Sequence, residues 1–219
     1  MISQEDILKS MEECGLIPVF NHTDAKVALK VLDACYEGGV RVFEFTNRGD
    51  NAHEVFDILI RHSEKYNDLI LGIGTIFSAD DAKKFIDIGA KFIVSPAMIP
   101  EMANFCKSQN VLWVPGCGTV TEIHQAVQLG AKMVKAFPGN VLGPGFVKSV
   151  KAVFPQLPIM PTGGVAPSEE NLKPWFDAGV TCVGMGSKLI SKEIISTENF
   201  DTLEANLRTA LELIKKLRA

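Results

Sequence analysis

The hydrophobic positions of the chain gather in eight short runs, each about as long as a β-strand. They cover residues 16–20, 40–46, 69–76, 92–97, 111–117, 133–138, 158–164 and 182–187. Within each run the apolar residues are nearly continuous rather than alternating, which is typical of parallel strands that are covered on both faces. The pattern therefore predicts eight buried, parallel strands.

Amphipathic helical patterns separate these runs. In the first pattern, hydrophobic residues recur at the spacing of one helix face: Val27, Ala28, Val31, Leu32 and Cys35. Thr23 stands where an N-cap is expected, and Gly38-Gly39 stands where the helix must end. Ser78 and Thr119 are expected to open the helices after the third and fifth strands, because each precedes an acidic residue by three positions, as in a capping box.

A repeated junction supports this count of units. Gly38-Gly39, Gly89, Gly130 and Gly179 each lead directly into an apolar run, namely the second, fourth, sixth and eighth. Glycine readily adopts the left-handed conformation that ends a helix, so the chain can drop straight from each helix into a strand.

Strict alternation of strands and helices, with no linker and no shift in composition, predicts a single α/β domain over residues 1–219. Eight strand–helix units favour a compact (β/α)8 TIM barrel, with further helices at about residues 3–14 and 202–218. A doubly wound open sheet is the alternative, but its GxGxxG fingerprint is missing. Gly72-Ile73-Gly74 begins like one and then lacks the third glycine.

The composition mainly excludes certain classes of protein. The 219 residues are 47% hydrophobic and carry 22 Lys+Arg against 26 Asp+Glu, which argues against a disordered chain and against a nucleic-acid partner. No apolar run reaches the ~18 residues of a membrane span, and the polar N-terminal segment lacks the apolar stretch of a signal peptide. We therefore expect a cytoplasmic protein with no membrane partner.

The cysteines and histidines argue against a metal. The five cysteines are odd in number and contain no CxxC pair, and the four histidines show no ligand spacing such as HExxH. We expect free thiols in a reducing compartment, no disulfide framework and no metal site.

Functional side chains of a barrel gather at the C-terminal ends of its strands. The second strand ends with Glu44 and Thr46 on one face, and Arg48 follows in the loop. A carboxylate set between two phenylalanines suits a general acid/base. The structural alternative is a buried ion pair between Glu44 and Arg48.

Lys135 is the basic residue within the otherwise apolar sixth strand. Burial disfavours the ammonium form of an amine, and a neutral amine can attack a carbonyl to form a Schiff base. The alternatives are a lysine that snorkels from a strand end and a plain ion-pair partner for Glu44.

Glycine-rich segments follow the last two strands, at Gly163-Gly164 and at residues 184–187. They lead toward helices and expose backbone N–H groups, and the loops after strands seven and eight are the usual phosphate site of this barrel. Thr75, which follows a glycine at the end of the third strand, is a candidate for substrate contact or for packing. Ser95-Pro96 closes the fourth strand and is a candidate turn.

Six short segments, all at predicted strand ends, carry a resemblance to a known family. They are residues 44–48, 72–75, 95–96, 134–139, 161–165 and 184–187. With them the chain resembles the 2-keto-3-deoxy-6-phosphogluconate (KDPG) aldolase / 4-hydroxy-2-oxoglutarate aldolase family over about residues 17–189.

The resemblance implies a class I (Schiff-base) aldolase that is a cytoplasmic homotrimer and needs no cofactor. It would reversibly cleave KDPG to pyruvate and glyceraldehyde 3-phosphate, as in the Entner–Doudoroff route, or 4-hydroxy-2-oxoglutarate to pyruvate and glyoxylate. The alternatives are a galactonate-type (KDPGal) aldolase of the same family and an isomerase or synthase of the phosphate-binding barrel type. A non-catalytic phospho-sugar binding protein is a third interpretation.

The resemblance also implies residue roles, with Lys135 as the Schiff-base lysine and Glu44 as the general acid/base acting through a water. The implied substrate-binding residues are Arg48 and Thr75 for the carboxylate, Pro96 and Phe137 for the pocket wall, Gly163, Gly164 and Ser187 for the phosphate, and Thr162 and Gly186 beside them. Thr162 resembles the gluconate type. The sequence departs from the family pattern at two positions. Gly49 follows Arg48 where many relatives have a threonine, and Asn21 ends the first strand where some relatives have an arginine.

Overall fold

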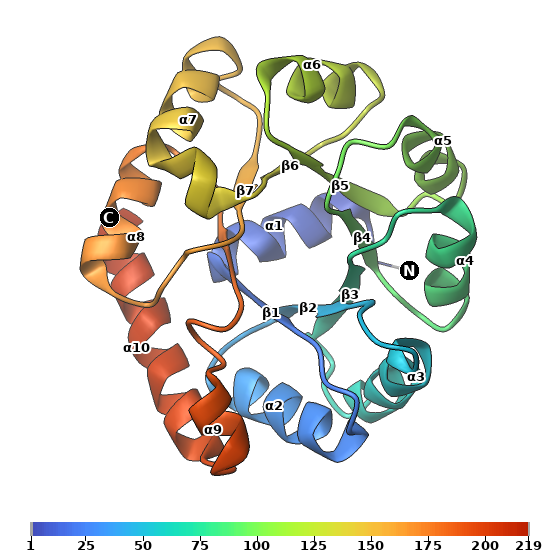
Figure 1. The fold of residues 1–219 in the computed structure, drawn as a ribbon, viewed down its shortest axis with the longest axis vertical. Coiled ribbons are helices and arrows are strands. Elements are labelled where there is room, and N and C mark those ends of the chain that lie inside the picture. The colour runs from blue at the N-terminus through green and yellow to red at the C-terminus, as the bar shows by residue number, and fades with distance from the viewer. Residues whose placement is uncertain (1, 219) are drawn as a thin grey trace.

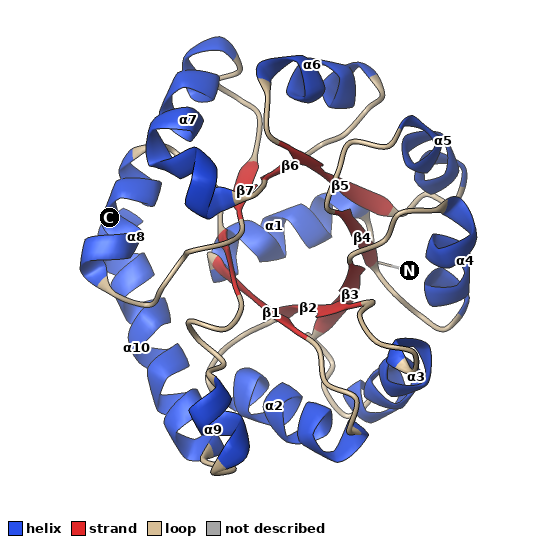
Figure 2. Ribbon diagram, in the orientation of Figure 1, coloured by secondary structure: helices blue, strands red, loops and turns tan. Residues whose placement is uncertain are grey.

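The computed structural model describes residues 2–218 and contains eight parallel strands in one sheet. The strands are β1 (Leu16–Phe20), β2 (Val42–Thr46), β3 (Ile70–Gly74), β4 (Phe92–Ser95), β5 (Leu112–Cys117), β6 (Val134–Ala136), β7 (Ile159–Pro161) and β8 (Val183–Met185). Figures 1 and 2 show them as a ring inside a ring of helices.

The sheet is nearly closed. Its strand order is β7-β6-β5-β4-β3-β2-β1-β8, and a single bridge between Thr162 and Gly184 links β7 to β8. The predicted (β/α)8 barrel is therefore confirmed. Every strand is shorter than or equal to its apolar run, because buried residues such as Val40 lie outside the ladder.

Helices connect the strands and flank them at both ends of the chain. They are α1 (Gln4–Cys14), α2 (Ala25–Glu37), α3 (Ala52–Ser63), α4 (Ala79–Asp87), α5 (Pro100–Ser108), α6 (Val120–Gln128), α7 (Gly139–Val153), α8 (Glu169–Asp177), α9 (Lys192–Ser196) and α10 (Phe200–Arg218). The helical path of α7 is interrupted at Gly143, whose φ of 70° and ψ of 170° precede Pro144.

Local signals in the sequence predict several of the helix ends. The hydroxyls of Ser78 and Thr119 each accept a hydrogen bond from the backbone three residues on, as predicted. The prediction of Thr23 as N-cap is wrong: Asp24 caps α2, because its carboxylate accepts from the Lys26 N–H at 2.8 Å. The junction glycines Gly39, Gly89, Gly130 and Gly179 all have positive φ, as expected.

The hydrophobic core has two parts. The larger one lies between the strands and the surrounding helices. The smaller one fills the barrel itself and includes Ile7 and Met11 of α1 together with inward residues such as Val42, Phe92 and Met160. Because α1 ends at Cys14, immediately before β1, it closes the end of the barrel at which the strands begin; Figure 1 shows it behind the ring of strands. A substrate site is thus confined to the other end.

Candidate active site

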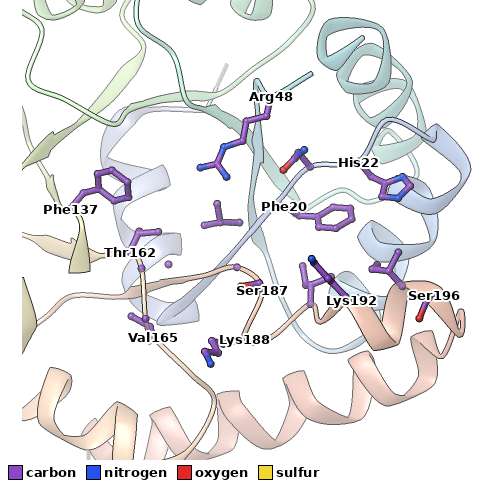
Figure 3. A pocket seen from close by; sticks show the side chains of 18 residues that line it. Phe20, His22, Arg48, Phe137, Thr162, Val165, Ser187, Lys188, Lys192 and Ser196 are labelled. Atoms are coloured by element: carbon purple, nitrogen blue, oxygen red, sulfur yellow. The ribbon is translucent and has the colours of Figure 1, made fainter. Parts of the chain in front are cut away.

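A cavity of about 580 Å³ lies at the C-terminal ends of the strands. Its wall is made by the end of β1, by Arg48 and Phe137, and by the glycine-rich segments after β7 and β8 (Figure 3). This strand-end cavity contains seven of the residues that the resemblance implies: Arg48, Phe137, Thr162, Gly163, Gly164, Gly186 and Ser187.

Glu44 and Lys135 form a buried pair inside the barrel, beneath the cavity. Lys135 Nζ lies 3.4 Å from Glu44 Oε1, and the two residues are 5% and 0% exposed. The amine also lies 5.3 Å from the centre of the Phe137 ring, which lines the cavity. The snorkelling alternative for Lys135 is therefore wrong, and Glu44 pairs with Lys135 rather than with Arg48.

Glycines on β3 leave space for side chains of the two neighbouring strands. A Cβ atom at Gly74 would stand 1.9 Å from Glu44 Oε1, and one at Gly72 would stand 2.4 Å from the Phe92 ring. Gly74 lies directly opposite Thr46 in the parallel register of β2 and β3. The Gly-x-Gly of this strand is thus explained by close packing against side chains of the neighbouring strands, and not by a phosphate loop.

Three buried polar atoms at this level have no hydrogen-bond partner within the described protein: Glu44 Oε2, Thr46 Oγ1 and Thr162 Oγ1. Gly184 leaves room for the Thr162 side chain, because a Cβ atom at position 184 would lie 2.3 Å from Thr162 Oγ1. Buried polar atoms left unpaired cost about 1–3 kcal/mol each. Glu44 stands beside Lys135 and Thr162 lines the cavity, so a small polar ligand bound there would offer these atoms partners.

Arg48 and Thr75 follow neighbouring strands. Arg48 is exposed, directs its guanidinium into the cavity (Figure 3), and forms no ion pair within residues 2–218. Thr75 is half-buried and does not line the cavity. Its φ of 62° is left-handed, a conformation rare for a β-branched residue and typical of functional sites.

The residues at the end of β4, Ser95 and Pro96, contact other parts of the protein and do not line the cavity. The Ser95 hydroxyl is buried and accepts a hydrogen bond of 2.9 Å from Trp113 Nε1. Pro96 does not line the cavity. Its carbonyl oxygen approaches Gly116 so closely that a Cβ there would stand 2.3 Å away. Ser95 therefore packs outward, while Pro96 lies beside the barrel mouth.

Two lysines of the cavity wall, Lys188 and Lys192, were not predicted from the sequence. Lys188 directly follows the predicted phosphate residue Ser187, so its position could have indicated it. Lys192 begins α9, a five-residue helix too short for a periodic pattern to reveal.

Among residues 2–218, no three histidine, cysteine, aspartate or glutamate side chains lie close enough together to hold a metal ion. Within that range, no helix combines the length and the apolarity that crossing a bilayer requires.

Comparison with known proteins places this geometry in a family. A family profile described as "KDPG and KHG aldolase" matches residues 7–206. The 2-dehydro-3-deoxy-phosphogluconate aldolase of Haemophilus influenzae is 27% identical over 96% of this chain and 98% of its own length. That of Pseudomonas aeruginosa is 31% identical over 91% and 89%. The crystal structure of KDPG aldolase from Legionella pneumophila, with pyruvate captured as a covalent carbinolamine, matches with a TM-score of 0.85 at 26% identity, over 93% of this chain and 97% of that one. The chain therefore belongs to the KDPG and KHG aldolase family, a family of aldehyde-lyases, as its motifs predict.

Proposed function

We propose that this aldolase is of class I, with Lys135 forming a Schiff base and KDPG as substrate. The observation that carries the proposal is the buried pair itself. A lysine and a carboxylate, 3.4 Å apart and shielded from solvent, lie beneath a cavity of substrate size, and the amine is 5.3 Å from the ring centre of Phe137 in the cavity wall. The pyruvate carbinolamine in the Legionella relative supports the same chemistry, since a carbinolamine requires an amine.

The reaction follows from these two groups. The Lys135 amine attacks C2 of the keto acid, and Glu44 moves protons while water leaves and an iminium forms. The C4 hydroxyl then loses its proton, the C3–C4 bond breaks, and its electron pair enters the iminium to give an enamine. Glyceraldehyde 3-phosphate departs as the aldehyde. Protonation of the enamine at C3 and hydrolysis of the iminium release pyruvate and restore the amine.

The remaining residues are proposed to hold the substrate. Arg48 suits a planar carboxylate, which it can bind with two parallel hydrogen bonds, and Thr75 lies at the neighbouring strand end. Phe137 covers the amine from the cavity side. At the other end, the backbone of Gly163-Gly164 and Ser187 would bind the phosphate.

Borohydride trapping tests the proposal. With pyruvate and borohydride, the wild type should gain one reduced adduct on Lys135 by mass spectrometry, and Lys135→Ala should gain none. Lys151→Ala is the matched control, because burial lowers the pKa of Lys151 and makes it the competing amine. An adduct that survives in Lys135→Ala, or one that is lost in Lys151→Ala, would refute the assignment.

A substrate panel tests the finer points. The gluconate- and galactonate-derived phosphates differ at C4, and the 2-dehydro-3-deoxy-6-phosphogalactonate aldolase of Escherichia coli is 35% identical over 55% of this chain and 58% of its own length. Thr162 supports the gluconate type, so KDPG should give the higher kcat/KM. A higher value for KDPGal or 4-hydroxy-2-oxoglutarate would move the assignment to that substrate.

We also propose a homotrimer that works in the cytoplasm, as the resemblance implies, with a place in the Entner–Doudoroff route. The five cysteines are all free thiols, which suits a reducing compartment. Light scattering should give three times the chain mass of 23.9 kDa. A monomer or dimer mass would contradict the trimer without affecting the chemistry.

A further inference from the structure

The strand-end cavity is positively charged without compensation. Its wall contains three cationic side chains, Arg48, Lys188 and Lys192, and no aspartate or glutamate. None of the three forms an ion pair within residues 2–218. Some surface lysines pair with acids, for example Lys30 with Glu198 and Lys173 with Asp177, whereas the cations of this cavity have no acid beside them in its wall. A cavity lined by one sign of charge concentrates ligands of the opposite sign.

The cations stand in two groups. Arg48 reaches in from the loop after β2, whereas Lys188 and Lys192 belong to the segment between β8 and the start of α9. Figure 3 shows the two lysines on the opposite side of the cavity from Arg48, with Ser187 beside them. The cavity therefore offers separate positive charges for two anionic groups of one ligand.

The first strand contributes no charged side chain to the cavity. The end of β1 lines the same cavity with Asn21, which is uncharged. Lys188 directly follows the glycine-rich segment 184–187 after β8, and Lys192 lies four residues further along the chain, at the start of α9. Two ammonium groups, each a compact point charge, suit a phosphate dianion better than a single carboxylate.

We propose that Lys188 and Lys192 bind the terminal phosphate of the substrate and make the enzyme select phosphorylated 2-keto-3-deoxy sugar acids over shorter or unphosphorylated ones. The proposal rests on the proposed aldolase function. In KDPG the phosphate lies beyond C6, at the far end from the carboxylate. In 4-hydroxy-2-oxoglutarate the second anion is attached directly to C4, so it would end short of the lysines.

The test compares kcat/KM for KDPG and for 2-keto-3-deoxygluconate, which lacks the phosphate, in Lys188→Ala, Lys192→Ala and the double variant. Each single variant should lower the value for KDPG by roughly 10–100-fold, the usual size of a hydrogen bond to a charged group, and the value for 2-keto-3-deoxygluconate by less than about 2-fold. Arginine at either position should restore much of the loss, because the charge returns.

Lys215→Ala is the matched control. Lys215 is exposed in the last turn of α10 beside Cys14, at the end of the barrel opposite the cavity. Its removal changes the net charge equally but should leave both substrates unaffected. An equal loss for both substrates in the cavity variants, or no loss for KDPG, would overturn the proposal.

Failure of the aldolase function gives a different result. If the wild type traps no pyruvate, the proposed function falls. Titration with inorganic phosphate, followed by calorimetry, needs no turnover and still tests the lysines. Wild-type binding that weakens at least tenfold in the double variant supports their role, and equal binding in both proteins refutes it.

Discussion

Gly74 determines how closely Glu44 can approach Lys135, so Gly74→Ala moves the carboxylate without removing it. A Cβ atom at this position would stand 1.9 Å from Glu44 Oε1 and 2.7 Å from its Cδ. Cβ atoms essentially never show contacts below 3.0 Å, so the carboxylate must move by about 1 Å, and a misplacement of that size costs roughly 10²-fold in rate. The same Oε1 lies 3.4 Å from the amine. We therefore expect kcat for KDPG to fall by roughly 10²-fold.

The barrel should remain folded in this variant. The φ of Gly74 is not left-handed, so alanine fits the backbone. Overpacking by one methyl group costs about 1–3 kcal/mol, which for a chain of this size lowers Tm by about 2–12 °C. Circular dichroism should show one cooperative transition, and turnover is measured by coupling pyruvate release to lactate dehydrogenase.

Two comparisons make the test specific. Gly145→Ala is the control, since a Cβ there meets no atom within 4 Å, and it should match the wild type in Tm and kcat. Shortening the acid should relieve the contact, so Gly74→Ala combined with Glu44→Asp should be no slower than Glu44→Asp alone. A folded Gly74→Ala enzyme with near-normal turnover would refute the claim that the position of Glu44 matters.

Three further results are expected. Glu44→Gln should lower kcat by roughly 10²–10⁴-fold while pyruvate still binds; a variant that melts far lower yet turns over normally when folded would make Glu44 merely structural. Activity should survive exhaustive EDTA treatment, and a loss restored by a divalent metal would contradict the Schiff-base chemistry. Although burial opposes the shift, hydrogen bonds from Tyr66, His62 and Lys65 hold the pKa of Asp33 below its usual value. Ionised Asp33 therefore adds stability above about pH 4 that is lost as pH falls through the lowered pKa. Urea unfolding at pH 7 and pH 3 should show a smaller difference for Asp33→Asn than for the wild type, and an equal difference would count against this contribution.

A further prediction concerns the reactivity of the cysteine thiols. Burial raises the pKa of Cys106 and of Cys117 to about 12, and it also raises the pKa of Cys35 and Cys182. Only the thiolate reacts with iodoacetamide. Mass spectrometry of the folded protein at pH 8 should therefore show at most one rapid adduct, on the half-buried Cys14, and two or more would contradict the burial.

The sequence could predict the barrel because each strand is buried on both faces and so appears as an uninterrupted apolar run. It could also place Glu44 and Lys135, since an ionisable side chain stands out within such a run. The role of Gly74 was out of reach, because it depends on the register that sets Gly74 opposite Thr46. The short helix that carries Lys192 depends likewise on tertiary packing, which overrides local patterns. The break in α7 has a local cause instead, because Gly143 directly precedes Pro144.

The closure of one barrel end by α1 has a practical consequence. Gln4 at the start of α1 bonds to Asn110, just before β5, and Arg218 at the end of α10 bonds to the carbonyls of Glu12 and Thr181. Both ends of the described chain thus lie on the face where the strands begin, away from the strand-end cavity. A resin or a carrier domain tethered through either end would leave the mouth of the cavity open, so the protein is suited to immobilisation in a flow reactor for carbon–carbon bond synthesis.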